Sequence, residues 1–186
     1  MRVIAGTKKG LLLKAPSGDN IRPTSAKVKE ALFSMLDPYI NGAFFLDLFA
    51  GTGSIGIEAL SRGASRAVFI DDNINALACI NKNVLKCGFT RESKIQRSDA
   101  FRFLGKTRDI YDIIYLDPPY NDDISAHIKV ISERKLLSAD GVCAVECAAF
   151  SPPNIEFDIL KNKLYNATRV IIFPITLKED LDGYNP

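Results

Sequence analysis

The sequence is poor in the residues that hold metal ions and disulfides. Its 186 residues include only four cysteines and one histidine. The cysteines form neither a C-x-x-C pair nor a recognisable zinc-ligand spacing: Cys79, Cys87, Cys143 and Cys147. We therefore expect no metal site, and reduced thiols as in the cytoplasm. His127 follows a polar stretch and is predicted to occupy an exposed helix position rather than a catalytic one.

Long apolar runs are also absent. No stretch is long and apolar enough to cross a membrane, and none follows the first basic residues as in a signal peptide. Hydrophobic residues make up 47% of the chain and charged residues 25%, values typical of a globular protein. The length predicts one domain with a sizeable core. We expect a cytoplasmic monomer with no obligate protein partner.

The net charge is only +2, but it is unevenly distributed. Residues 1–30 contain seven Lys or Arg and two acidic residues, a net charge of +5, which leaves −3 for the remainder. A basic N-terminal segment on a mildly acidic body indicates a polyanionic partner. A solvated hairpin without a partner accounts for the same charges equally well.

The hydrophobic pattern predicts a small β-rich arm (1–22), an α/β domain (23–173) and an acidic tail (174–186). An apolar stripe at helical spacing predicts a first helix after Thr24, ended by Pro38 and Gly42. Apolar strands then alternate with helices, which is typical of a mostly parallel sheet with helices on both faces. The predicted strands are 44–49, 66–70, 93–97, 111–116 and 141–147, the helices are 54–61, 73–86 and 124–135, and a closing antiparallel hairpin is formed by 157–165 and 168–173.

A glycine-rich loop follows the first predicted strand of the sheet. It contains Asp47 and the pattern Gly51-x-Gly53-x-x-Gly56, which lets a ligand approach the backbone at a helix N-terminus. Asp71 ends the next strand, where a carboxylate can accept both hydroxyls of a ribose. Glycines with an acid 20 positions on also fit a dinucleotide fingerprint. A tight turn without ligand explains the glycines but not the two acids.

The position of Asp47 favours a different cofactor. A negative charge just before the glycines would repel the pyrophosphate of a dinucleotide, whereas S-adenosylmethionine offers a cationic methionine end. Asp99 and Ala100, after the third strand, could contact an adenine amino group and ring. Asp99 is equally suited to capping a helix.

The segment Asp117-Pro-Pro-Tyr120 ends a strand abruptly. Proline cannot donate to a sheet ladder, and each proline holds the preceding residue in extended geometry. A carboxylate, a carbonyl and an aromatic ring are thereby fixed together. A rigid turn alone would need none of these groups.

Together these motifs resemble the class I methyltransferases that methylate exocyclic amino groups of bases. A wider set of sequence segments, spread over residues 1 to about 173, is similar to the bacterial enzymes that methylate guanine N2 in small-subunit (16S) ribosomal RNA. The segments that carry this resemblance are Met1-Arg-Val-Ile-Ala-Gly, Arg22-Pro-Thr24, Val28-Lys-Glu-Ala-Leu-Phe33 and DLFAGTGSIGIEALSRGA from Asp47 to Ala64. The chain departs from the family pattern at Asn166, where Gly is usual, and in the acidic stretch from Glu179 to Asp182.

The resemblance implies a Rossmann-like fold and S-adenosylmethionine as cofactor. In the cofactor site, Asp47 would face the methionine ammonium, Asp71 the ribose and Asp99 the adenine, with further contacts from Gly51, Gly53, Ala100 and Thr24. In the catalytic site, Asp117 and the Pro118 carbonyl would accept the hydrogens of the target amine, and Tyr120 would stack on the base. The partner would be ribosomal RNA or an assembling small subunit, contacted by Arg2, Lys8, Lys9, Lys14 and Arg22.

Other functions remain open at this point. An adenine-N6 methyltransferase on DNA or RNA uses the same kind of loop, but a DNA enzyme usually needs a target-reading domain that 186 residues leave no room for. A protein glutamine methyltransferase would resemble Asn-Pro-Pro-Tyr, whereas this chain has Asp117. The more distant alternatives are an NAD-dependent oxidoreductase and a non-catalytic RNA chaperone.

Overall fold

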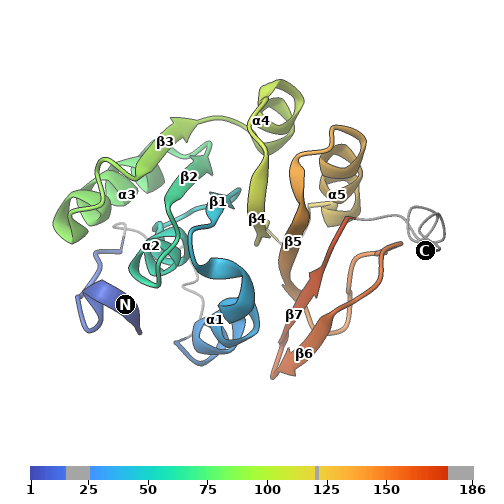
Figure 1. Ribbon diagram of the computed structural model, residues 1–186, viewed down its shortest axis with the longest axis horizontal. Helices are drawn as coiled ribbons and strands as arrows, with labels where there is room; N and C mark the ends of the chain where they lie inside the picture. Colours follow the sequence, from blue (N-terminus) through green and yellow to red (C-terminus); the bar gives the residue numbers. More distant parts are fainter. Residues whose placement is uncertain (16–25, 120–121, 176–186) are drawn as a thin grey trace, which may run out of the picture.

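The computed structural model describes residues 1–15, 26–119 and 122–175. Arg22, Thr24, Tyr120 and the predicted acidic tail beyond residue 175 lie outside these ranges, so the roles predicted for them stay predictions. The described chain forms one seven-stranded sheet in the order β3-β2-β1-β4-β5-β7-β6 (Figure 1). The strands are β1 (Phe44–Asp47), β2 (Arg66–Asp71), β3 (Ser93–Arg97), β4 (Tyr111–Leu116), β5 (Leu137–Ala148), β6 (Lys161–Tyr165) and β7 (Thr168–Phe173).

Strands β1 to β5 are parallel, and β6 and β7 form an antiparallel hairpin that joins the sheet at β5. Asn166 in the hairpin turn has φ +53°, which is the left-handed conformation. Asparagine tolerates this conformation, so the turn forms without the glycine that is usual in the family pattern described above. The helices are α1 (Ala26–Ile40), α2 (Ser54–Ser61), α3 (Ile74–Cys87), α4 (Ala100–Lys106) and α5 (Ile124–Glu133).

Two hydrophobic clusters cover the two faces of the sheet. One cluster packs α1, α2 and α3 against alternate strand residues such as Phe45, Phe69 and Tyr115. The other packs α4 and α5 against the opposite residues, such as Leu46 and Ile114. This is the predicted doubly covered, mostly parallel α/β sheet, and it follows from strands that are apolar on both faces. No helix in the described ranges is long and apolar enough to span a bilayer.

Several predicted boundaries differ from the structure. Pro38 lies inside α1 rather than at its end, because Ile40, in the last turn, is buried in the core. The short helix α4 is absent from the prediction, because seven residues are too few to establish a helical period even though Ala100, Phe103 and Leu104 are apolar and buried. Among the strands, β1 ends at Asp47, β5 already begins at Leu137, and β6 begins only at Lys161.

The N-terminal arm is less regular than predicted. Among residues 1–15 there is one isolated bridge, Arg2 to Leu12, and a short 3-10 turn rather than a β-strand. The arm is nevertheless held firmly, since Val3 and Leu13 are buried in the core. Three backbone bonds close it as a loop: Val3 N–H donates to Leu11 O at 2.9 Å, Gly10 N–H to Val3 O at 2.8 Å, and Leu13 N–H to Met1 O at 2.9 Å.

Glu58, in α2, joins the arm to the helices. Its fully buried carboxylate accepts the backbone N–H groups of Ile4 (2.8 Å) and Ala5 (2.9 Å). It also pairs with Lys29 Nζ at 3.2 Å and with Arg62 Nε at 2.9 Å. Burial lowers the pKa of Lys29, and only 2% of its surface is exposed. Lys29 therefore belongs to the interior and not to a basic surface.

The prediction of an exposed His127 is wrong. Only 1% of its surface is exposed, because its ring stacks on Phe101 with centroids 3.8 Å apart and meets Phe49 edge-on at 5.3 Å. Its Nδ1 lies 3.0 Å from the carbonyl oxygen of Asp123. The polar residues before His127 belong to the start of α5, while His127 itself faces α4.

Candidate functional site

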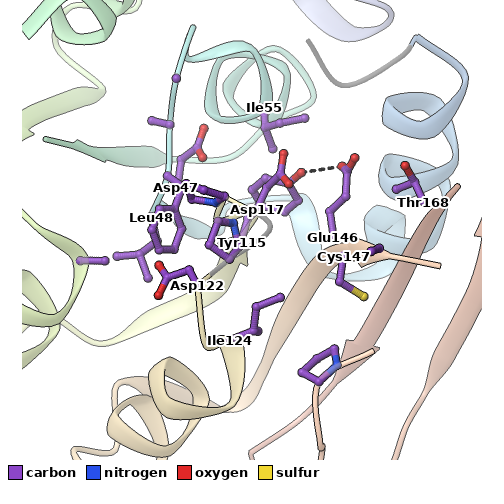
Figure 2. A pocket seen from close by; sticks show the side chains of 18 of the residues that line it. Asp47, Leu48, Ile55, Tyr115, Asp117, Asp122, Ile124, Glu146, Cys147 and Thr168 are labelled. Atoms are coloured by element: carbon purple, nitrogen blue, oxygen red, sulfur yellow. Dashed lines mark hydrogen bonds between the residues drawn. The ribbon is translucent and has the colours of Figure 1, made fainter. Parts of the chain in front are cut away.

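Strands β1 and β4 are neighbours in the sheet, but the chain continues from them toward opposite edges of the sheet. After β1 the chain passes to β2, and after β4 it passes to β5, so a crevice opens at the carboxyl ends of these two strands. Open α/β sheets bind ligands at such a position. A cleft of about 960 Å³ lies here, lined by the loops after β1, β2, β3, β4 and β5 and by the β6–β7 turn (Figure 2).

The lining of this cleft is strongly acidic. Its carboxylates come from the ends of several strands and the segments that follow them: Asp47, Asp71, Asp72, Asp99, Asp117, Asp122, Asp123 and Glu146. Among the described residues, the only basic side chain in the lining is Lys27. Such a cleft attracts cationic and hydrogen-donating ligands and repels a pyrophosphate.

Asp47 is the most deeply buried of these acids, with 1% of its surface exposed. Its Oδ2 accepts the N–H of Gly56 at 3.0 Å, whereas its buried Oδ1 has no hydrogen-bond partner within the described part of the chain. Burial raises the pKa of Asp47 to about 7, and the nearby charge of Asp71 adds to the rise. A donor or cation in the cleft would satisfy this oxygen and hold the carboxylate in its ionised form.

Asp71 also holds the backbone of the neighbouring loops, a role that the sequence did not indicate. Its Oδ2 accepts the N–H of Gly51 at 2.8 Å, and its Oδ1 accepts that of Asn73 at 2.9 Å. Burial raises its pKa, while these two bonds oppose the rise. Each carboxylate oxygen can accept more than one donor, so Asp71 can shape the glycine loop and still receive ribose hydroxyls.

The glycines of the loop serve two purposes. Gly51 has φ +54°, and a side chain there would point into open space, so the residue is needed for its conformation beside the cleft. Gly56 lies against β2, and a Cβ atom there would stand 2.3 Å from the ring of Phe69. The loop can therefore lie close both to a ligand and to the sheet, whereas Gly53 does not itself line the cleft.

Asp99 caps a helix and also lies at the cleft, so its predicted contact with the adenine stays a prediction. It is the N-cap of α4, and its Oδ1 accepts the N–H of Arg102 at 3.0 Å. Asp99 and Ala100 both line the cleft. The cap fixes the carboxylate at the rim without using all of its accepting capacity.

Asp117 and Pro118 lie where they were predicted, at the end of β4 and in the lining of the cleft. Sequence reasoning missed their neighbour, Glu146 in β5. Glu146 is 8% exposed, and its Oε2 accepts the hydroxyl of Tyr115 at 2.8 Å (Figure 2). A glutamate within an otherwise apolar strand was the available signal, because such a residue is rarely buried without a partner.

The predicted RNA-binding lysines are not clustered at the cleft. Arg2, Lys9 and Lys14 are exposed. Lys8 is half-buried with its Nζ 5.5 Å from the ring centre of Phe89, and its N–H donates to Ser61 Oγ at 3.0 Å. Ser61 ends α2, which begins at the cleft, and a helix of eight residues is about 12 Å long. Lys8 therefore lies at the far end of α2 from the cleft.

Lys14 is nearer to the cleft. Its N–H donates to Asn83 Oδ1 at 2.8 Å, and Asn83 Nδ2 donates to the carbonyl oxygen of Thr52 in the glycine loop at 3.0 Å.

Within the described ranges, no three His, Cys, Asp or Glu residues are arranged to hold a metal ion.

Most of the chain matches a known protein family. The family described as "Conserved hypothetical protein 95" matches residues 1–174. The chain belongs to this family. Among curated relatives of this Conserved hypothetical protein 95 member, the "Putative rRNA methyltransferase YlbH" of Bacillus subtilis is 42% identical over 78% of this chain and 82% of the relative. The "Ribosomal RNA small subunit methyltransferase D" of Escherichia coli is 33% identical over 78% of this chain and 74% of the relative.

A solved structure extends the likeness to three dimensions. The "Putative methyltransferase yhhF from Escherichia coli" superposes with a TM-score of 0.82 and 27% identity, over 93% of this chain and 96% of that one. The fold is thus that of the class I methyltransferases, as the strand order and the switch-point cleft indicate.

Proposed function

We propose that this protein transfers a methyl group from S-adenosylmethionine to the exocyclic N2 amine of a guanine in small-subunit ribosomal RNA. The observation that carries the proposal is the set of carboxylates in the cleft, among which Asp117 directly follows β4 and is itself followed by Pro118. The names of the curated relatives support ribosomal RNA as the acceptor.

The charge of the cleft supports the cofactor. S-adenosylmethionine supplies an electrophilic methyl group when bound, and it carries a cationic ammonium and a cationic sulfonium. Asp47, whose Oδ1 has no hydrogen-bond partner among the described residues, suits the ammonium, and Asp71 suits the ribose hydroxyls. Asp99 suits the adenine amino group. A nicotinamide dinucleotide would place its pyrophosphate among these acids, with Lys27 the single described cation in the lining.

The rigid end of β4 supports the chemistry. An exocyclic amine conjugated with its ring has a poorly nucleophilic lone pair. Asp117 and the Pro118 carbonyl accept its two hydrogens and turn the lone pair toward the methyl group, and Tyr120 stacks on the base. The proton that the nitrogen loses passes to the Asp117 carboxylate or to water. Positioning of this kind can contribute roughly 7–11 kcal/mol.

The direct test is methyl transfer itself. The protein is incubated with labelled S-adenosylmethionine and, in parallel, with small-subunit ribosomal RNA, assembled small subunits, DNA and protein. Mass spectrometry of nuclease digests then identifies the methylated atom. We expect N2-methylguanosine in the RNA or the subunits. Methyl transfer to adenine, to DNA or to protein would contradict the proposal.

Asp71→Asn is expected to weaken S-adenosylmethionine binding by about 1–3 kcal/mol, because a charged acceptor for buried hydroxyls is lost. Asparagine keeps one accepting oxygen, so it retains one of the two bonds to the N–H groups of Gly51 and Asn73, and circular dichroism checks that the fold is preserved. Calorimetric titration measures the affinity, with Asp72→Asn, an exposed acid of the same lining, as the matched control. Unchanged affinity would remove Asp71 from the cofactor site, and binding heat from NAD would favour a dehydrogenase.

Lys9→Ala combined with Lys14→Ala is expected to flatten the salt dependence of RNA binding by roughly one to two units of slope, because each phosphate contact releases counterions. Both side chains are exposed, and within the described residues neither forms an ion pair with an acid. The measurement is RNA affinity at several salt concentrations.

The matched control is Lys94→Ala combined with Lys129→Ala. These lysines are 60% and 74% exposed and lie opposite Asp109 and Glu133, so the same charge is removed elsewhere. An equal change of slope in both double variants would mean that the arm makes no special RNA contact.

A further inference from the structure

The cleft contains a second carboxylate beside Asp117 for which the proposed mechanism has no use. Strands β4 and β5 are parallel neighbours, and Leu116 pairs with Val145. Asp117 follows the first of these residues and Glu146 follows the second, so they occupy equivalent positions on strands about 4.8 Å apart. Both side chains belong to the face that also carries Tyr115 and Ala144. The two carboxylates therefore lie side by side in the lining of the cleft.

Tyr115 holds Glu146 in place. The tyrosine is 1% exposed, and its hydroxyl donates to Glu146 Oε2 at 2.8 Å (Figure 2). The pKa of this hydroxyl is held well above its usual range, mainly by burial and to a smaller extent by the charges of Asp117 and Glu146. The hydroxyl therefore keeps its proton and remains a donor. A buried carboxylate is costly to desolvate, and a carboxylate can accept several hydrogen bonds. Glu146 is thus a fixed acceptor that can serve a donor in the cleft.

The Watson–Crick edge of guanine offers such a donor. Beside its N2 amine, guanine carries an N1–H, whereas adenine carries an N1 lone pair beside its N6 amine. When Asp117 and the Pro118 carbonyl accept the N2 hydrogens, the base can lie with its N1–H toward the neighbouring carboxylate, which would repel the N3 lone pair of the opposite orientation. An adenine held in the same way would direct its N1 lone pair at a negative charge, which is repulsive.

We propose that Glu146 determines the base specificity of this enzyme by accepting the N1–H of the target guanine, with Tyr115 as its positioning residue. The inference rests on the proposed function and deepens it, because it explains how the cleft distinguishes guanine from adenine when both present an amine.

The experiment uses an analogue that changes N1 and keeps the N2 amine. The guanine methylated by the wild-type protein is first mapped in small-subunit ribosomal RNA, and ligated RNA is made with 2,6-diaminopurine at that one position. In this base an N1 lone pair replaces the N1–H, and an amino group replaces the carbonyl oxygen at C6, so the Glu146 variant below is needed to assign the effect to N1. The wild-type protein should prefer guanine in kcat/KM by on the order of 100-fold or more, because a site built for a donor rejects an analogue without it.

The decisive variant is Glu146→Gln. Its amide has the same shape and can still bond the Tyr115 hydroxyl, and its NH2 group can donate to the N1 of diaminopurine. We expect slower guanine methylation, faster diaminopurine methylation, and a preference reduced to within about tenfold. Asp72→Asn, which removes a charge elsewhere in the lining, should keep the wild-type preference. Tyr115→Phe should reduce it partly, since the charge stays but its position is no longer held.

Three results would overturn the inference: wild-type protein that methylates both bases equally, Glu146→Gln protein with the wild-type preference, or equal slowing of both bases, which a purely structural role predicts. Failure of the proposed function is seen separately. It would appear in the mapping step as methyl transfer to an atom other than guanine N2, before any Glu146 variant is made.

Discussion

Asp117→Ala is expected to lower the rate of methyl transfer by roughly 100- to 10,000-fold, because the acceptor that orients the amine and takes its proton is lost. The affinity for S-adenosylmethionine should change little, since Asp47 and Asp71 lie on other strands. A lower rate at unchanged affinity would mean that Asp117 stabilises the transition state rather than the bound cofactor. Single-turnover methyl transfer to RNA measures the rate, and calorimetric titration measures the affinity.

Asp117→Asn is the matched comparison. Asparagine keeps one accepting oxygen at the same position, so its rate should lie between those of the alanine variant and the wild-type protein. Methyl transfer by Asp117→Ala within tenfold of the wild-type rate would contradict the role assigned to this carboxylate. Equally low rates of the alanine and asparagine variants would assign the effect to the negative charge of Asp117 rather than to one accepting oxygen.

Among the variants proposed for this protein, Glu58→Ala is expected to destabilise the fold most, lowering the free energy of unfolding by roughly 3–5 kcal/mol. The variant leaves Lys29, which is 2% exposed, as an uncompensated charge in the core. It also deprives the N–H groups of Ile4 and Ala5 of their acceptor. Urea unfolding at neutral pH measures the loss.

Two comparisons identify the cause. Lys29→Met in the Glu58→Ala background should recover part of the stability, because the buried charge is removed together with its partner. Glu133→Ala breaks an exposed pair with Lys129 and should cost at most about 1 kcal/mol. A loss below 1 kcal/mol for Glu58→Ala would mean that the arm is not held through this carboxylate.

Much of the fold could be predicted because its signals are local. Apolar strands alternating with helices specify a parallel sheet wherever both faces are covered, and α2, β3 and β4 lie at their predicted bounds. The residues after parallel strands meet at one edge of the sheet, so Asp47, Asp71, Asp99 and Asp117 could be assigned to one site before any contact was known.

The rest depends on which elements become neighbours. His127 and Lys29 have polar sequence surroundings, yet each is buried by another helix or by the arm. Glu146 stands out in its strand, but its place beside Asp117 follows only from the pairing of β4 with β5. By itself the sequence determined the order of strands and helices, the glycine loop and the acids at the strand ends, because periodicity and turn chemistry are properties of adjacent residues. Only the tertiary structure decided which buried charges meet and which lysines reach solvent, because burial and pairing depend on residues far apart in the chain.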